Sequence, residues 1–123
     1  MEDVNVITKL AIEALEDVKG KDIVELSTGN LTSLFQRMII ATGDSNRQVK
    51  ALGRSVEAKL KEAGADIVGA EGFEFGEWVL VDAGDVVVHV MLPAVRDYYD
   101  IEALWGGEKP SFHTNAKPWN AAQ

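Results

Sequence analysis

Two aspartates beside a hydrophobic run are the residues of this sequence best placed to do chemistry. Asp82 and Asp85 flank the dipeptide Ala83-Gly84 between two apolar segments. A close pair of carboxylates can bind a magnesium ion, which could then support phosphoryl or nucleotidyl transfer. Side chains converge on one face of a strand when they are two positions apart, whereas Asp82 and Asp85 are three positions apart around a turn sequence. The spacing favours a turn-forming role, with a magnesium-dependent enzyme as the alternative.

Histidine is the next residue type that could do chemistry, and the chain has two histidines and no cysteine. His89 lies in the apolar run 86–91, on the side of Val87 and Met91 if that run is a strand. A neutral imidazole that hydrogen-bonds a neighbour is the favoured interpretation, and acid–base catalysis is the alternative. No nucleophile is paired with a base, and no cluster of ligands has metal-binding spacing. We therefore expect no catalytic residue, no metal and no other cofactor.

Aromatic residues that carry a polar atom form a further group: Trp78, Tyr98, Tyr99 and Trp105. Such residues are concentrated at the centres of protein interfaces, although each could instead close the edge of a core. Because no catalytic constellation competes with them, we interpret the chain as a binding module. Trp78, Tyr98 and Trp105 are its candidate contact residues.

Composition indicates one globular domain with an acidic surface. The 123 residues are 46% hydrophobic and 26% charged, which suits a compact domain with its own core. Twelve Lys and Arg residues against twenty Asp and Glu residues give a net charge of −8, so we expect no direct sequence-specific binding of nucleic acid. The sequence begins without a signal-peptide pattern and contains no apolar run of membrane-spanning length. We expect a cytoplasmic protein that does not enter a membrane.

Hydrophobic periodicity predicts the elements that must position these residues. The last two predicted strands form a β-hairpin around Asp82–Asp85. Residues 1–105 are expected to form a single α/β domain, a mixed sheet of about five strands with helices packed on it, and residues 106–123 a flexible C-terminal arm. The predicted helices are 3–18, 46–63 and a short helical stretch from Pro93 to Trp105, and the predicted strands are 22–26, 37–42, 66–70, 78–81 and 86–91.

The central predicted helix has clear signals at both ends. Ser45 is its expected N-cap, with Gln48 in the capping-box position, and Gly64 is its expected stop. Gly53 lies inside the buried stripe and costs about 1 kcal/mol of helix stability relative to alanine. We expect close approach of the helix to the sheet to compensate. The predicted stripe is Val49, Leu52, Gly53, Val56, Leu60 and Ala63.

Three ordered motifs resemble a known family. They are MIIATGDSNRQV at 38–49, WVLVDAGDVVVHV at 78–90 and RDYYDIEALW at 96–105. The chain resembles the ribosomal silencing factor family, also called RsfS or Iojap, from the first helix to Trp105. At Ala83 relatives often carry a larger leucine or tyrosine, and at Phe35-Gln36 they commonly have Thr-Asp.

The resemblance implies an α/β fold related in shape to nucleotidyltransferases, usually a homodimer, with no established catalytic activity. Family members bind the large ribosomal subunit through its ribosomal protein fourteen. They prevent the small subunit from joining, which lowers translation when nutrients are scarce. The resemblance assigns partner contact to Trp78, Val81, Ala83 and Asp85.

Overall fold

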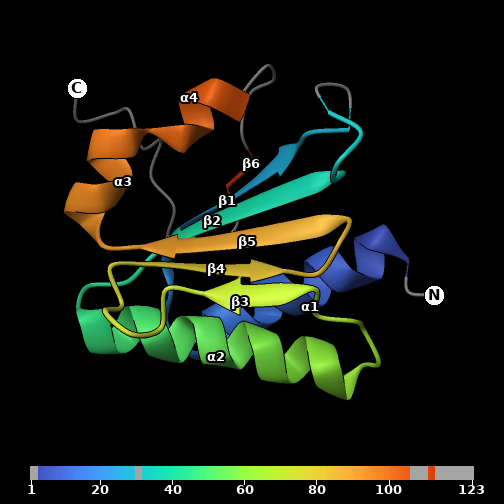
Figure 1. The fold of residues 1–123 in the computed structure, drawn as a ribbon, viewed down its shortest axis with the longest axis horizontal. Helices are drawn as coiled ribbons and strands as arrows, with labels where there is room; N and C mark the ends of the chain where they lie inside the picture. The colour runs from blue at the N-terminus through green and yellow to red at the C-terminus, as the bar shows by residue number, and fades with distance from the viewer. Residues whose placement is uncertain (1–2, 30–31, 106–110, 113–123) are drawn as a thin grey trace.

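A six-stranded sheet lies between two layers of helices in the computed structural model, which describes residues 3–29, 32–105 and 111–112 (Figure 1). The first two helices cover one face of the sheet, and the two short helices lie on the other. None of these four helices combines the length and apolar character that a bilayer crossing requires. The helices are α1 (Val4–Asp17), α2 (Asn46–Glu62), α3 (Pro93–Tyr99) and α4 (Ile101–Trp105).

The sheet is mixed, as predicted, and its described strands follow the order β3-β4-β5-β2-β1-β6. The central neighbours β2 and β5 are parallel, while β4 and β5 form the expected antiparallel hairpin. The α/β fold class is therefore confirmed, and the likeness in shape to nucleotidyltransferases stays a prediction. The strands are β1 (Lys21–Ser27), β2 (Arg37–Thr42), β3 (Gly69–Glu71), β4 (Trp78–Asp82), β5 (Val86–Met91) and β6 (Ser111–Phe112).

The two edges of the sheet differ from the prediction. β3 covers only the end of the expected strand 66–70, although the Val68 N–H still donates to the Asp82 carbonyl at 2.7 Å. At the other edge, two residues of the expected arm form β6 and pair with β1 at Val24 and Glu25. The rest of the arm, 106–110 and 113–123, lies outside the described residues. The sheet thus gains one strand that periodicity did not predict, because a two-residue strand has no pattern of its own.

Each face of the sheet has its own hydrophobic core. The larger core lies under α1 and α2, and the smaller core lies under α3 and α4. β2 and β5 contribute to both cores, which explains their apolar runs without alternation. The buried members of the smaller core are Val24, Leu26, Met38, Ile40, Met91 and Ile101.

The ends of α2 follow the sequence signals with two differences. Ser45 Oγ accepts the Gln48 N–H at 3.1 Å, as an N-cap should. The side-chain oxygen Oε1 of Gln48, however, accepts the Asp44 N–H at 2.6 Å rather than that of Ser45. Gly64 has a φ of +89° just beyond the helix, as its expected stop role requires. Ala63 was expected in the buried stripe but is exposed, because it caps the last turn where α2 has passed the sheet.

Substitution of Gly53 tests the close approach of α2 to the sheet. An alanine Cβ there would lie 2.6 Å from Val79 Cγ1 and 2.9 Å from Phe73 Cε1. We expect Gly53→Ala to lower the free energy of unfolding by about 1–3 kcal/mol, because overpacking outweighs the gain in helix propensity. Urea denaturation measures the change. Gly69→Ala is the matched control, since its Cβ would meet nothing within 4 Å; a stabilised Gly53→Ala protein would refute the close approach.

Candidate partner-binding surface

Four rings from three elements lie together beside the smaller core, and we call them the aromatic cluster: Trp78, His89, Tyr98 and Tyr99. The Trp78 indole lies 5.9 Å from the imidazole of His89 and 5.0 Å from the ring of Tyr99, centroid to centroid. The Tyr98 and Tyr99 rings meet edge to face at 4.9 Å. β4, β5 and α3 therefore build one continuous aromatic surface.

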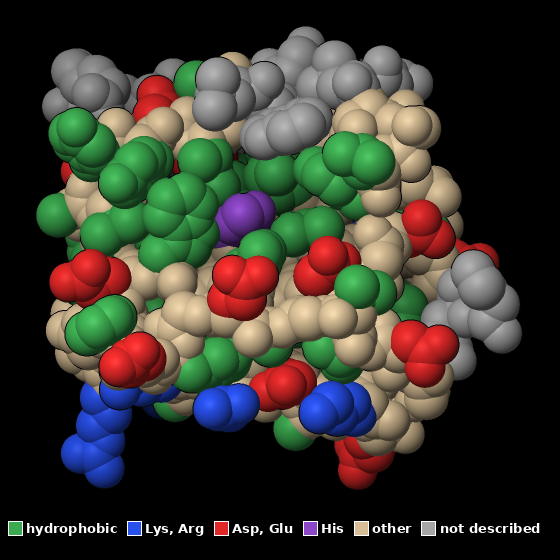
Figure 2. Space-filling model, in the orientation of Figure 1, with side chains coloured by type: hydrophobic (Ala, Val, Ile, Leu, Met, Phe, Trp, Pro, Cys, Tyr) green, Lys and Arg blue, Asp and Glu red, His purple; other side chains and the backbone are tan. Residues whose placement is uncertain are grey.

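Side-chain exposure within the aromatic cluster increases from the core toward solvent. Trp78 packs against the smaller core and is half-buried, as is His89. Tyr98 is 81% exposed and Tyr99 is 53% exposed. Figure 2 shows hydrophobic side chains gathered around a single imidazole on this face, which is His89 because His113 is not described. Large exposed aromatic rings around a half-buried tryptophan are typical of a contact surface.

A hydrogen bond fixes the pair at the centre of the cluster. The Trp78 indole N–H donates to His89 Nδ1 at 3.0 Å. Burial lowers the pKa of His89 from 6.5 to about 4, so the imidazole is neutral at pH 7 and its Nδ1 is free to accept. The prediction of a neutral, hydrogen-bonded His89 is confirmed.

The low pKa of His89 predicts an acid-sensitive fold. Unfolded His89 takes up a proton near pH 6.5, whereas folded His89 resists protonation until about pH 4. Its contribution of about 3 kcal/mol is therefore complete above the unfolded value and is lost as the pH falls between these two values. We expect the stability advantage of the wild type over His89→Asn to shrink by that amount in urea denaturation between neutral pH and about pH 4. A constant advantage would contradict the burial of a neutral imidazole.

The variant comparison is needed because another buried group titrates in the opposite direction. Burial raises the pKa of Glu102, although the neighbouring Arg96 opposes the rise. A raised carboxyl pKa favours the folded state as the pH falls, so Glu102 offsets part of the His89 effect in the wild type. His89→Asn keeps Glu102, and the difference between the two proteins isolates His89.

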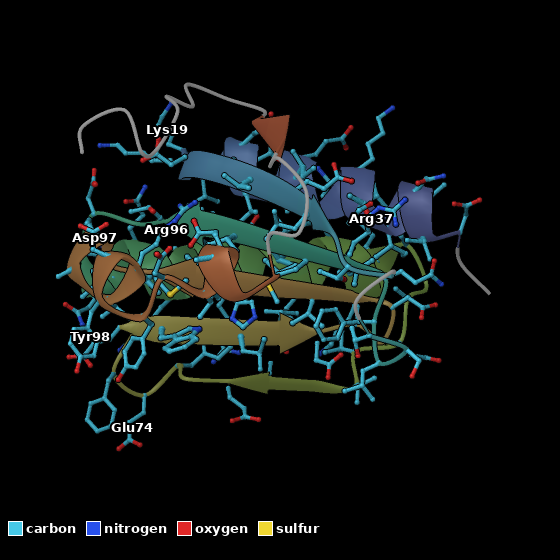
Figure 3. All side chains as sticks on the ribbon, turned by 90° about the horizontal axis from the view of Figure 1, so that it is seen from above. Lys19, Arg37, Glu74, Arg96, Asp97 and Tyr98 are labelled. Carbon is cyan, nitrogen blue, oxygen red and sulfur yellow. The ribbon has the colours of Figure 1, made fainter. Side chains whose placement is uncertain are left out.

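A buried ion pair holds α3 on the sheet. Arg96 and Glu102 are 4% and 2% exposed; Arg96 Nε donates to Glu102 Oε2 at 2.7 Å, and Arg96 Nη2 lies 2.7 Å from the same oxygen in an ion pair. Arg96 Nη1 also donates to the Asp22 carbonyl at 2.8 Å and to Thr42 Oγ1 at 2.7 Å. Figure 3 shows Arg96 directed inward, whereas Tyr98 points outward from the same helix. Arg96 thus ties the helix that presents the two tyrosines to β1, β2 and α4.

Acidic side chains lie around the aromatic cluster. Glu74, Glu77 and Asp97 are exposed, and Figure 3 places Glu74 and Asp97 at the same end of the molecule as Tyr98. In Figure 2 carboxylates border the hydrophobic area, while the basic side chains of this view lie along its lower edge, over α2. An apolar centre with an acidic border complements a partner that has apolar and basic groups.

The two candidate catalytic aspartates have structural roles in the hairpin turn. Asp82 Oδ1 accepts the Gly84 N–H at 2.8 Å, and Gly84 has a φ of +86°. The Asp85 carbonyl accepts the N–H groups of Gln36 and Arg37 at 2.8 and 3.0 Å. The favoured turn-forming interpretation is confirmed for Asp82. In the part of the chain that the structure describes, no group of three or more His, Cys, Asp or Glu side chains could hold a metal ion.

The family model described as "Ribosomal silencing factor during starvation" matches residues 2–123. The chain belongs to this ribosomal silencing factor family. The resemblance carried by the three sequence motifs is therefore confirmed, and the match extends through the segment beyond Trp105.

Individual members of the silencing factor family are similar in sequence to this chain over most of both chains. A Ribosomal silencing factor RsfS of Chromobacterium violaceum is 79% identical over 120 residues, covering 97% of this chain and 98% of the relative. The Bacillus subtilis protein of the same name is 39% identical over 100 residues, covering 81% and 85%. A crystal structure of a Chromobacterium violaceum protein, 79% identical, superposes with a TM-score of 0.85 over 96% of this chain and 99% of that one.

The resemblance to silencing factors implied partner contact by residues of β4 and of the turn that follows it. In the structure these residues lie at opposite ends and on opposite faces of the strand. Trp78 begins β4, whereas Ala83 and Asp85 lie in the turn at the other end of that strand. The four residue steps from Trp78 to Asp82 put the start of this turn about 13 Å from Trp78. Val81 is 0% exposed and belongs to the larger core. Side chains three apart on a strand face opposite ways, so Val81 lies behind the surface that Trp78 faces, and its direct contact with a partner stays a prediction.

Ala83 and Asp85 line a hollow of about 310 Å³ between the hairpin turn and the end of α2. Both are half-buried, so they stay available for contact by a partner that reaches this end. Trp105 is the last residue of α4, and its side chain lies outside the described part of the structure. Its role stays a prediction.

Sequence reasoning missed two residues of this candidate surface. Leu80 shares the face of Trp78 and is half-buried, which the alternation along β4 could have indicated. His89 was expected to be hydrogen-bonded, but its link to Trp78 depends on the β4–β5 register, in which Leu80 lies opposite His89 and Trp78 opposite Met91. A sequence does not state which strand residues lie opposite each other.

Proposed function

We propose that this chain binds the large ribosomal subunit through its aromatic cluster and prevents the small subunit from joining. The observation that carries the proposal is an exposed aromatic surface on a chain that belongs to the ribosomal silencing factor family. The contact on the ribosome is ribosomal protein fourteen, as the sequence resemblance implies. Repression of translation under nutrient limitation follows, in accord with the family description.

Charge supports a protein rather than bare RNA as the direct contact. The chain has a net charge of −8, and carboxylates border the aromatic cluster. Ribosomal RNA would repel this border, whereas basic side chains of a ribosomal protein would attract it. Complementary charge speeds encounter and orients the partner, and the aromatic rings then supply the buried contact area.

Steric exclusion needs no catalysis, so the function that we propose for this chain is not enzymatic. A rigid domain that occupies a surface needed by the small subunit inhibits by competition alone. Inhibition is effective when the bound fraction of large subunits is high at the cellular concentration of the factor. A homodimer in the free state and a cytoplasmic place of action belong to the same proposal.

Reassociation of purified subunits tests this function. Large subunits preincubated with an excess of the protein should sediment separately from added small subunits in a sucrose gradient at a magnesium concentration that otherwise favours whole ribosomes. The protein should sediment with the large subunit. Normal yields of whole ribosomes at saturating protein would refute steric exclusion, and the reverse order of addition shows whether preformed ribosomes resist it.

A further inference from the structure

We propose that His89 is both a positioning residue for Trp78 and a polar contact of the aromatic cluster, one that donates a hydrogen bond from Nε2 to an acceptor oxygen of the protein partner. The proposal deepens the function proposed above and rests on it. It commits the partner to a specific chemistry: an apolar patch that carries one backbone carbonyl or carboxylate oxygen opposite His89.

The hydrogen bond from Trp78 decides where the imidazole proton lies. The indole nitrogen can only donate, and His89 Nδ1 lies 3.0 Å from it. Nδ1 must therefore be the unprotonated nitrogen, and a neutral imidazole then carries its proton on Nε2. The same bond holds the Trp78 ring in one orientation, so each residue positions the other.

The neighbours of His89 in the sheet leave Nε2 without a polar partner of its own. Ile40 on β2 and Leu80 on β4 lie opposite His89, and both are apolar. Among residues 3–29, 32–105 and 111–112, no hydrogen bond to Nε2 is found, and this nitrogen is not one of the fully buried unpaired atoms. Figure 2 shows the imidazole reaching the surface amid hydrophobic side chains. Nε2–H is thus a single donor at the centre of an apolar surface.

A donor in this setting selects among partners. Binding of an apolar patch without an acceptor would remove water from Nε2–H and leave it unsatisfied, which costs more than an ordinary hydrogen bond gains. A partner that supplies an oxygen at this point avoids that cost. The low pKa of His89 keeps the donor neutral at physiological pH, so its selectivity does not depend on charge.

Two amide substitutions separate the two roles of His89. The side-chain amide of asparagine reaches the position of Nδ1, whereas that of glutamine reaches the position of Nε2. His89→Asn should keep the Trp78 indole signal near its wild-type position in a ¹H–¹⁵N spectrum and bind isolated large subunits about tenfold more weakly. His89→Gln should shift the indole signal and bind more tightly than His89→Asn. His89→Phe lacks both nitrogens and should show both defects.

The imidazole ¹⁵N shifts of the wild type, read at pH 7, test the tautomer directly. A proton on Nδ1 would overturn the proposal, and so would wild-type affinity of His89→Asn. If the wild type itself does not bind large subunits, the proposed function fails and the partner contact fails with it. The tautomer and the indole signal of His89→Gln still decide whether His89 positions Trp78, so the two failures are distinguishable.

Discussion

Trp78→Ala is expected to weaken binding to the large ribosomal subunit about a hundredfold or more, the largest functional effect of any single substitution in this chain. Trp78 contacts His89 and Tyr99 and also packs on the smaller core. Its removal leaves a gap at the centre of the aromatic cluster and releases the neighbouring rings. Centrally placed, half-buried tryptophans carry a large share of the binding free energy at protein interfaces.

Cosedimentation with purified large subunits measures this effect, and far-ultraviolet circular dichroism checks the fold. Val6→Ala is the matched control, because Val6 is an exposed apolar residue on α1, across the sheet from the cluster. Trp78→Phe keeps an aromatic ring and should retain more affinity than Trp78→Ala. A folded Trp78→Ala protein that binds as the wild type does would remove the aromatic cluster from the interface.

Arg96→Met is expected to lower the free energy of unfolding by about 3–5 kcal/mol, the largest stability effect. The substitution leaves the Glu102 carboxylate buried without its cation and removes the donor to the Asp22 carbonyl and Thr42 Oγ1. A stranded carboxylate escapes part of this cost by taking up a proton, so the pKa of Glu102 should rise further.

Urea denaturation measures the loss, with Lys61→Met as the control. Lys61 pairs with Glu57 on the exposed face of α2, and breaking such a surface pair costs below about 1 kcal/mol. The double variant Arg96→Met with Glu102→Leu should recover much of the stability, because no buried charge remains. Equal losses in Arg96→Met and Lys61→Met would show that the buried pair does not hold α3 in place.

Sequence reasoning succeeded where one local pattern determines the element. The boundaries of β2 and β5 match the predicted runs 37–42 and 86–91, because both are continuous apolar runs, Gly43 follows β2 and the Asp82–Asp85 turn precedes β5. The N-cap Ser45 and the stop at Gly64 were equally local signals. The close approach at Gly53 followed from the cost of glycine within a helix, and the packing of Val79 against it agrees.

The features that sequence reasoning missed are contacts between distant elements. Arg96 and Glu102 belong to different helices, and Asp100, in the left-handed conformation with a φ of +46°, sets the angle between them. A non-glycine residue with positive φ is not indicated by its type alone. The Trp78–His89 bond depends on strand register in the same way. The sequence could therefore predict which residues belong to the candidate site, but not how their side chains contact one another.

The parallel pairing of β2 with β5 has a consequence for how quickly the chain acquires its fold. Arg37 lies opposite Val86, so this contact joins residues 86 − 37 = 49 positions apart. The β4–β5 hairpin and α2 need only local contacts and can form early, whereas the centre of the sheet must wait for a long loop to close. We therefore expect the docking of a preformed hairpin on β2 to limit the folding rate, and nascent chains that end before Val86 to expose one side of β2 to other polypeptides.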